Sequence, residues 1–120
     1  MVRNMLSSLE TVRDTLAALG NFGHYEAVDT SQPYGVWAED SESGELVADN
    51  YKPGQTIQGT IDWFTKDEDD PMLSAIPTAL NGARIGWSLN SVQYEEETGY
   101  IHYEWLFRVL QSWPDGSSED

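Results

Sequence analysis

Large apolar side chains alternate with mostly polar ones through residues 100–110, and this pattern constrains the fold more than any other part of the chain. Successive side chains of a strand point to opposite faces, so one face of this segment is almost entirely hydrophobic. That face carries Ile101, Tyr103, Trp105, Phe107 and Val109. Burying a side chain of this size stabilises a fold by ~1.5–3 kcal/mol. The segment therefore predicts a strand at the centre of the core, paired with residues 84–94 across the glycine-containing turn at residues 95–99.

An amphipathic helix is predicted over residues 4–19, with Asn4 as its N-cap. Its apolar residues recur in steps of four and three and form one stripe, made of Met5, Leu9, Val12, Leu16 and Leu19. Two strands follow, a short one at residues 34–38 and a longer alternating one at residues 55–65. Gly59 inside the longer strand indicates a bulge or the close approach of another backbone segment.

A second helix is predicted to start at Asp70 and Pro71, because an aspartate can cap a helix and a proline fits its first turn. It should end near residues 81–82. Pro77 lies inside this span and predicts a bend, since a proline in a helix removes one hydrogen bond. The alternative is a helix that begins at Pro77.

The predicted order of helix, strand, strand, helix, strand, strand indicates an α+β domain. We expect a mostly antiparallel four-stranded sheet with both helices packed on one face. Residues 1–111 would form this single domain and residues 112–120 a flexible acidic C-terminal tail. Residues 39–54 are predicted to be a long exposed loop with at most a short strand at residues 45–48. The open face of the sheet should display polar residues, namely Gln58, Asp62, Ser88, Asn90, His102 and Glu104.

The chain has a formal net charge of -15, from 21 acidic residues against six lysines and arginines. This charge opposes binding to phosphate backbones and anionic membranes, because contact would add repulsion instead of releasing counterions. The absence of cysteine excludes disulfides, thiolate zinc ligands and cysteine nucleophiles. No apolar run approaches the ~18 residues of a membrane helix, and Ser7, Ser8 and Glu10 interrupt the apolar region that a signal peptide needs. We therefore expect a cytosolic product without membrane contact.

Candidate catalytic and metal-binding residues are few. His102 is followed by Glu104 on the same strand face, a pattern more typical of a surface pair than of a catalytic or metal site. Asp67, Asp69 and Asp70 are candidate ligands for Ca²⁺ or Mg²⁺, but their segment lacks the ligand spacing of a calcium loop. A solvated helix start is the favoured interpretation. The sequence also lacks phosphate-binding and hydrolase motifs, so we expect neither enzymatic activity nor a cofactor.

Two stretches of the sequence resemble small proteins encoded in the tail-assembly regions of phages and prophages. They are IQGTIDWFTK at residues 57–66 and LNSVQYEEETGYIHYEWLFRV at residues 89–109. With the two predicted helices included, residues 5–110 are similar to the tail terminator (tail completion) proteins of long-tailed phages. The resemblance implies an α+β domain that assembles as a hexameric ring on the end of the tail tube. Its location would be the virion tail, reached from the host cytoplasm during assembly.

This resemblance also implies partners and contact residues. The partners would be further copies of the chain, the tail tube protein and a neck or head completion protein, with DNA passing through the ring without specific binding. Subunit or partner contacts are expected at Asp49, Asn50, Tyr51 and Lys52. Trp113 is expected to be a further contact on separate grounds, because five tryptophans are more than one small core usually needs. An acidic wall would keep the passing DNA mobile by repulsion. The acids expected to face the lumen are Glu42, Glu45, Glu95, Glu96 and Glu97.

Two other functions stay open on the sequence alone. A head–tail connector or other neck component would share the phage setting but bind the portal or adaptor first. An acidic module that mimics DNA would block a nucleic-acid-binding protein, and would need its acids in one row on a single surface. The acids fall in loops and ends that are separate in sequence, which favours the tail terminator.

Overall fold

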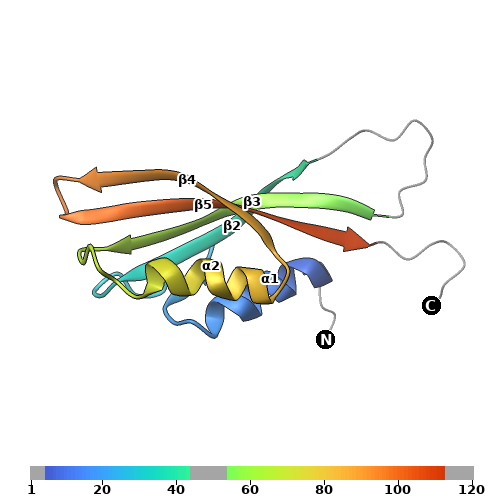
Figure 1. The fold of residues 1–120 in the computed structure, drawn as a ribbon, viewed down its shortest axis with the longest axis horizontal. Coiled ribbons are helices and arrows are strands. Elements are labelled where there is room, and N and C mark those ends of the chain that lie inside the picture. Colours follow the sequence, from blue (N-terminus) through green and yellow to red (C-terminus); the bar gives the residue numbers. More distant parts are fainter. Residues whose placement is uncertain (1–4, 44–53, 113–120) are drawn as a thin grey trace, which may run out of the picture.

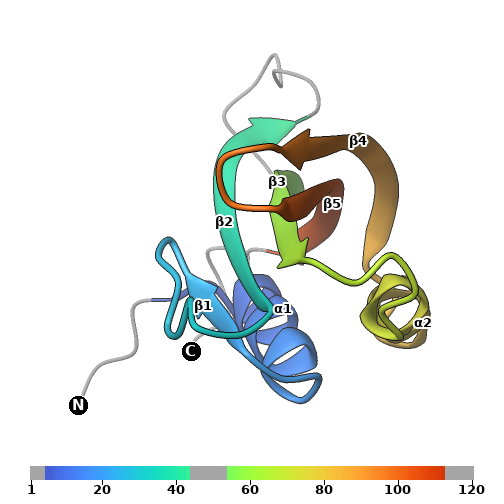
Figure 2. The same cartoon turned by 90° about the vertical axis from the view of Figure 1, so that its left-hand side faces the viewer.

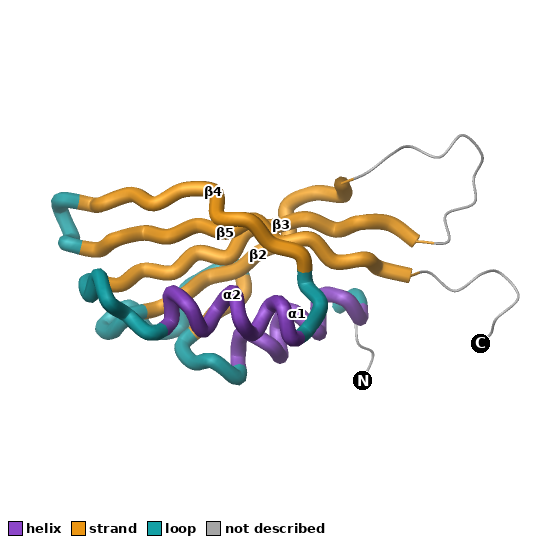
Figure 3. The backbone as a smooth tube through the Cα atoms, viewed as in Figure 1, coloured by secondary structure: helices purple, strands orange, loops and turns teal. Residues whose placement is uncertain are grey.

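The computed structural model describes residues 5–43 and 54–112 as one sheet with two helices (Figure 1, Figure 3). In chain order, the elements are α1 (Ser7–Ala17), β1 (Phe22–His24), β2 (Tyr34–Ser43), β3 (Gly54–Thr65), α2 (Met72–Gly82), β4 (Gly86–Glu95) and β5 (Tyr100–Ser112). The strands lie in the order β1-β2-β3-β5-β4, and every neighbouring pair is antiparallel except β1 with β2. The predicted α+β class is therefore confirmed.

The sheet has five strands, so the prediction of four is wrong. The additional strand, β1, has three residues and pairs in parallel with residues 35–37 of β2. Three residues are too few to show an alternating pattern, which is why the sequence did not reveal this strand. β2 also continues to Ser43, where a loop was predicted from residue 39 onward. Glu42 thus lies in a strand, opposite Ile57, while residues 45–48 lie outside the described part of the chain.

Both helices lie on one face of the sheet, as predicted, and the hydrophobic core lies between the two layers (Figure 2). The buried core residues are Leu9, Val12, Leu16, Trp37, Ile57, Ile61, Trp63, Ile76, Leu80, Ile85, Trp105, Phe107 and Val109. β5 occupies the predicted central position, between β3 and β4. Its first inward-facing residues, Ile101 and Tyr103, are only partly buried. Burial of the inward-facing side chains therefore decreases toward the turn that joins β4 to β5.

The start of α1 is held by a side chain from the other end of the described chain. The predicted cap, Asn4, lies outside the described residues, and the N-cap is Leu6, whose side chain makes no capping hydrogen bond. Buried Gln111 at the end of β5 takes this role: its Oε1 accepts from the Ser8 N–H at 2.9 Å, and its Nε2 donates to Ser7 Oγ at 3.2 Å. A side-chain acceptor here satisfies one of the helix's unpaired N–H groups. It also fixes α1 against β5.

α2 begins at Met72 with Pro71 as its N-cap, one residue later than predicted, and Asp70 holds this start from the preceding turn. Asp70 Oδ1 accepts from the Met72 N–H at 2.9 Å, and Oδ2 accepts from Trp63 Nε1 at 3.0 Å. Burial opposes ionisation of Asp70, but these hydrogen bonds outweigh it and hold the pKa of Asp70 below its usual value. Pro77 lies inside a single helix from Met72 to Gly82, so the alternative of a helix beginning at Pro77 is wrong.

Gly59 marks a close approach of the backbone, one of the two predicted alternatives, and the bulge lies opposite it in β2. Gly59 pairs with Glu39 of β2 at the point where the register between the two strands shifts. A Cβ at position 59 would lie 2.6 Å from the Phe107 ring and 2.7 Å from Glu39 Cα, and would overlap the carbonyl oxygen of Ala38. No side chain fits there without moving the backbone of β2.

Gly59→Ala should therefore destabilise the protein by more than about 2 kcal/mol, because the new methyl group overpacks a site walled by backbone. Chemical unfolding measures the loss. Gly86→Ala is the matched control, since its Cβ would meet its nearest neighbour at 3.5 Å, an ordinary contact. Equal stability of the two variants would show that β2 does not approach Gly59 this closely.

Asp70→Ala should lower stability by about 1–2 kcal/mol at neutral pH, because Met72 and Trp63 lose their acceptor. The folded pKa of Asp70 is lowered, so its contribution is present above the ordinary value of 3.8 and is lost as the pH falls through the folded value. Urea unfolding near pH 7 and near pH 2.5 tests this, with the exposed Asp69→Ala as a control expected to change stability by less than about 0.5 kcal/mol. A penalty that is the same at both pH values would contradict the role of the carboxylate charge.

Candidate functional site

The free edge of the sheet carries four exposed apolar side chains, which we call the edge row. Trp87, Leu89, Val92 and Tyr94 of β4 are 38%, 52%, 50% and 64% exposed. Each pairs with a residue of β5 that faces the helices, so the edge row lies on the same side of the sheet as the core. Trp87 is the least exposed of the four, and its Nε1 donates to Asn81 Oδ1 at the end of α2 at 2.8 Å. Beyond that point the row faces solvent.

A β-bulge keeps the edge row on one face. Strict alternation from Leu89 would place Val92 on the opposite face of β4. The register with β5 shifts between Leu89 and Ser91, so Asn90 is an extra residue and Val92 returns to the face of Leu89. Asn90 itself turns to the open face, where its Nδ2 donates to Glu104 Oε1 at 3.1 Å. Without the bulge, Val92 and Tyr94 would lie on the face opposite Trp87 and Leu89. The bulge therefore joins these two pairs in one row.

The edge row is also free of charge. Residues 85–94 contain no charged residue and no proline, although 22% of the whole chain is charged. Soluble proteins usually protect an edge strand with a charge, a proline or a covering segment, because unpaired N–H and C=O groups otherwise recruit another strand. An uncharged, apolar row on such a strand is typical of a surface that contacts protein. Our sequence analysis missed this surface, and the missing charges over residues 85–94 were the available signal.

A pocket of about 450 Å³ lies at the other edge of the sheet, beside β1, and we call it the edge pocket. Its apolar walls come from the start of α1 and from β3, and its polar residues come from β1, β2 and the residue after β1. The lining residues are Met5, Leu6, Leu9, His24, Tyr25, Glu39 and Ile57. Its volume falls within the range of small-ligand sites. Sequence reasoning also missed this site, because its walls come from four separate segments.

The polar groups of the edge pocket bind one another. The Glu39 carboxylate accepts a hydrogen bond from the Tyr25 hydroxyl, and its Oε1 lies 2.8 Å from His24 Nε2. The His24 ring stacks between Tyr25 and Trp37, with both centroid distances at 3.9 Å. Tyr25 has a positive φ of 71° and is held there by the hydrogen bond from its N–H to the Trp37 carbonyl oxygen at 2.9 Å.

Electrostatics support this internal pairing. Burial opposes ionisation of Glu39, but the hydrogen bonds from Tyr25 and His24 outweigh it and lower the pKa of Glu39. The same hydrogen bond raises the pKa of Tyr25. The carboxylate is thus already stabilised by its neighbours, and the part of the pocket left for an occupant is its apolar wall.

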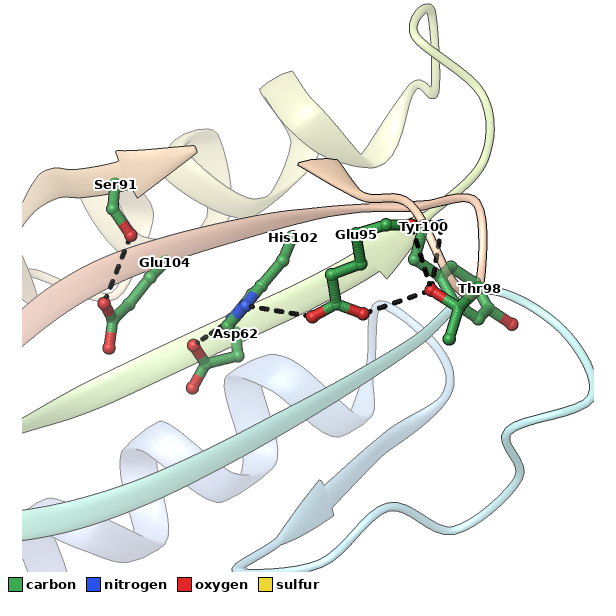
Figure 4. Close-up of polar contacts among 7 residues, drawn as sticks. All are labelled: Asp62, Ser91, Glu95, Thr98, Tyr100, His102 and Glu104. Atoms are coloured by element: carbon green, nitrogen blue, oxygen red, sulfur yellow. Dashed lines mark hydrogen bonds and ion pairs between the residues drawn. The ribbon is translucent and has the colours of Figure 1, made fainter. Parts of the chain in front are cut away.

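The open face of the sheet carries a second polar cluster, around His102 (Figure 4). His102 Nε2 lies 2.7 Å from Asp62 Oδ1, and Nδ1 lies 3.8 Å from Glu95 Oε2. Glu104 is bonded elsewhere, since its Oε1 accepts from Ser91 Oγ at 3.4 Å. The expected pairing of His102 with Glu104 is therefore replaced by a contact across strands to Asp62. Burial is the largest effect on Asp62 and raises its pKa, against the hydrogen bond from His102.

The structure brings two predicted acidic segments together. Residues 67–70 follow β3 and residues 95–97 precede β5, and because Thr65 pairs with Ile101 both turns lie at the same end of the sheet (Figure 1). Glu96 and Glu97 are exposed, whereas Glu95 ends β4 and is partly buried. The sequence had placed these acids in loops that were separate, so their convergence is a result of the fold.

The other predicted site residues are distributed differently. Asp67 Oδ1 accepts from the Asp69 N–H at 2.9 Å, and Asp70 is occupied by Met72 and Trp63 as described above. Within residues 5–43 and 54–112, no group of three or more histidine or acidic side chains is arranged to hold a metal ion. The remaining predicted residues lie outside the described part of the chain; they are Glu45, Asp49, Asn50, Tyr51, Lys52 and Trp113.

Comparison with known proteins adds no relative. Neither the protein-family models nor the curated proteins match this chain. Of the two helices described, neither is long and apolar enough to span a bilayer. Function is therefore best sought in the edge row, the edge pocket and the open face.

Asp62→Asn should leave the fold intact and relieve a cost of burial. The folded pKa of Asp62 is raised, so the native protein is favoured while this carboxyl is protonated and loses that advantage as the pH rises through the folded value. The amide keeps an oxygen acceptor for His102. The free energy of unfolding of Asp62→Asn minus that of wild type should therefore be larger near pH 7 than near pH 3. Urea unfolding of both proteins at both pH values measures this difference. The opposite trend would mean that the charge on Asp62 stabilises the sheet.

Proposed function

We propose that this chain is a structural assembly protein, a tail terminator at the end of a phage tail tube. In this proposal it binds further copies of itself through the edge row. The observation that carries the proposal is the exposed, uncharged row of Trp87, Leu89, Val92 and Tyr94 on β4, the strand at one edge of the sheet. A second chain can cover such a row and pair with the outer backbone groups of the strand at the same time.

Charge favours a second copy as the occupant. Each chain carries a net charge of -15, so two copies repel wherever their acids face one another. Residues 85–94 offer a contact that brings no like charges together. A basic partner would gain most by binding the acidic turns at residues 67–70 and 95–97 instead. Self-association is thus the use that best fits an apolar row in an acidic protein.

The phage tail setting is supported by the resemblance of residues 57–66 and 89–109. The acidic end of the sheet is consistent with it, because an assembly that repeats the turn at residues 95–97 would present a wall of carboxylates to passing DNA. In this proposal the ring would contact the tail tube protein on one side and a neck protein on the other.

A DNA mimic is the second candidate, and one observation favours it. The two acidic turns lie side by side at one end of the sheet, although they are separate in sequence. A mimic would use that end and leave the edge row without a role. The two functions are therefore distinguished by which surface a variant must alter to abolish binding.

Leu89→Glu should weaken self-association at least tenfold, because it places a charge in the middle of the edge row. Light scattering over a concentration series measures this. Ser88→Glu is the matched control, since it adds the same charge to the adjacent residue on the open face. Raising the salt from about 0.05 M to about 0.5 M should strengthen association of the wild type by screening the repulsion between acidic copies.

A wild-type protein that stays monomeric at every concentration, in high salt and with tail tube protein present, would contradict the proposal. So would equal effects of Leu89→Glu and Ser88→Glu in variants that unfold at the same temperature as the wild type. Recovery of a nuclease or repressor from a host lysate, abolished by neutralising the acids at residues 95–97 but not by Leu89→Glu, would favour the mimic.

A further inference from the structure

We infer that the edge row of one copy docks in the edge pocket of the next, so that copies join head to tail. This inference rests on the proposed function and adds the partner surface, made by Met5, Leu6, Leu9 and Ile57 around the His24–Tyr25–Glu39 cluster. The occupant of the pocket is then a second copy of this chain.

The positions of the two surfaces permit this contact. The edge row is on β4 and the edge pocket is beside β1, and these are the two outer strands of the sheet (Figure 2). Both surfaces lie on the helix side: the row shares the face of the core, and the pocket is walled by the start of α1 and by buried Ile57. Copies placed edge to edge therefore bring a row against a pocket.

The chemistry of the pocket selects an apolar occupant. Glu39 is already bonded to Tyr25 and His24, so a cationic or hydrogen-bonding ligand would have to displace these contacts. An apolar side chain needs no such exchange and gains by leaving water. The edge row supplies apolar side chains from residues 85–94, which carry no charge.

One head-to-tail contact also covers both exposed surfaces, whereas a twofold contact between two β4 strands would leave both pockets open. A contact between two different patches of the same chain is heterologous, and it generates a closed ring or an open filament. A twofold contact stops at a dimer. The edge pocket therefore explains how more than two copies can assemble through a single interface.

The test uses two variants, each defective in one half of the contact. Leu89→Glu disables the row and leaves the pocket, and Met5→Glu puts a charge at the pocket and leaves the row. Thr11→Glu is the control for the second variant, because it adds the same charge to an exposed position of α1 that does not line the pocket. Each protein is first checked for wild-type unfolding temperature, and a pocket variant that is unstable is replaced by Leu6→Glu.

Analytical ultracentrifugation of the separate and mixed proteins then decides. We expect Leu89→Glu and Met5→Glu each to associate at least tenfold more weakly than wild type, and an equimolar mixture to form pairs that neither forms alone. Wild-type association by Met5→Glu would overturn the head-to-tail contact while leaving the edge row as the assembly surface. Loss of association in both variants, with no pairs formed when the two are mixed, would also overturn the head-to-tail contact. A monomeric wild type would overturn the proposed function itself, and this inference with it.

Discussion

The pairing of β3 with β5 is the constraint on which the rest of the structure depends. It runs without a break from Gly54 with Ser112 to Thr65 with Ile101 and carries most of the buried sheet residues. Strands of this length extend about 40 Å, whereas the 11 residues of each helix extend only about 17 Å. The helices therefore cover part of the apolar face, and the face that continues onto β4 stays exposed. The apolar face at β4 thus stays uncovered because the helices are shorter than the strands.

The distribution of charge favours this exposed edge as the surface for association. An acidic chain resists contact with copies of itself. Its acids lie in α1, in the strands β2, β3 and β5 and in several turns, whereas residues 85–94 carry none. Residues 85–94 are consequently where association costs the least electrostatic free energy. At the opposite edge, the Glu39 carboxylate is bonded to Tyr25 and His24, so the apolar wall of the edge pocket is also presented without an unpaired charge.

Much of the fold could be predicted from periodicity. The stripe of Leu9, Val12 and Leu16, the alternation in β3, and the β4–β5 hairpin each extend over enough residues to be distinctive. β1 is too short for a pattern, and Glu39 to Ser43 are acidic and serine residues that only pairing with β3 holds in a strand. The site was harder to predict, because exposure depends on how far the helices reach. The bulge at Asn90, which realigns Val92 with Leu89, is likewise set by pairing with β5.

The central claim is that another copy covers β4, and hydrogen exchange tests it most directly. In an antiparallel edge strand, alternate N–H groups point away from the sheet and exchange freely unless a partner covers them. Amides of Gly86–Glu95 should therefore become protected as protein concentration rises, and Leu89→Glu should abolish that protection. Exchange in β4 that is unchanged between dilute and concentrated protein, while other segments become protected, would contradict the claim.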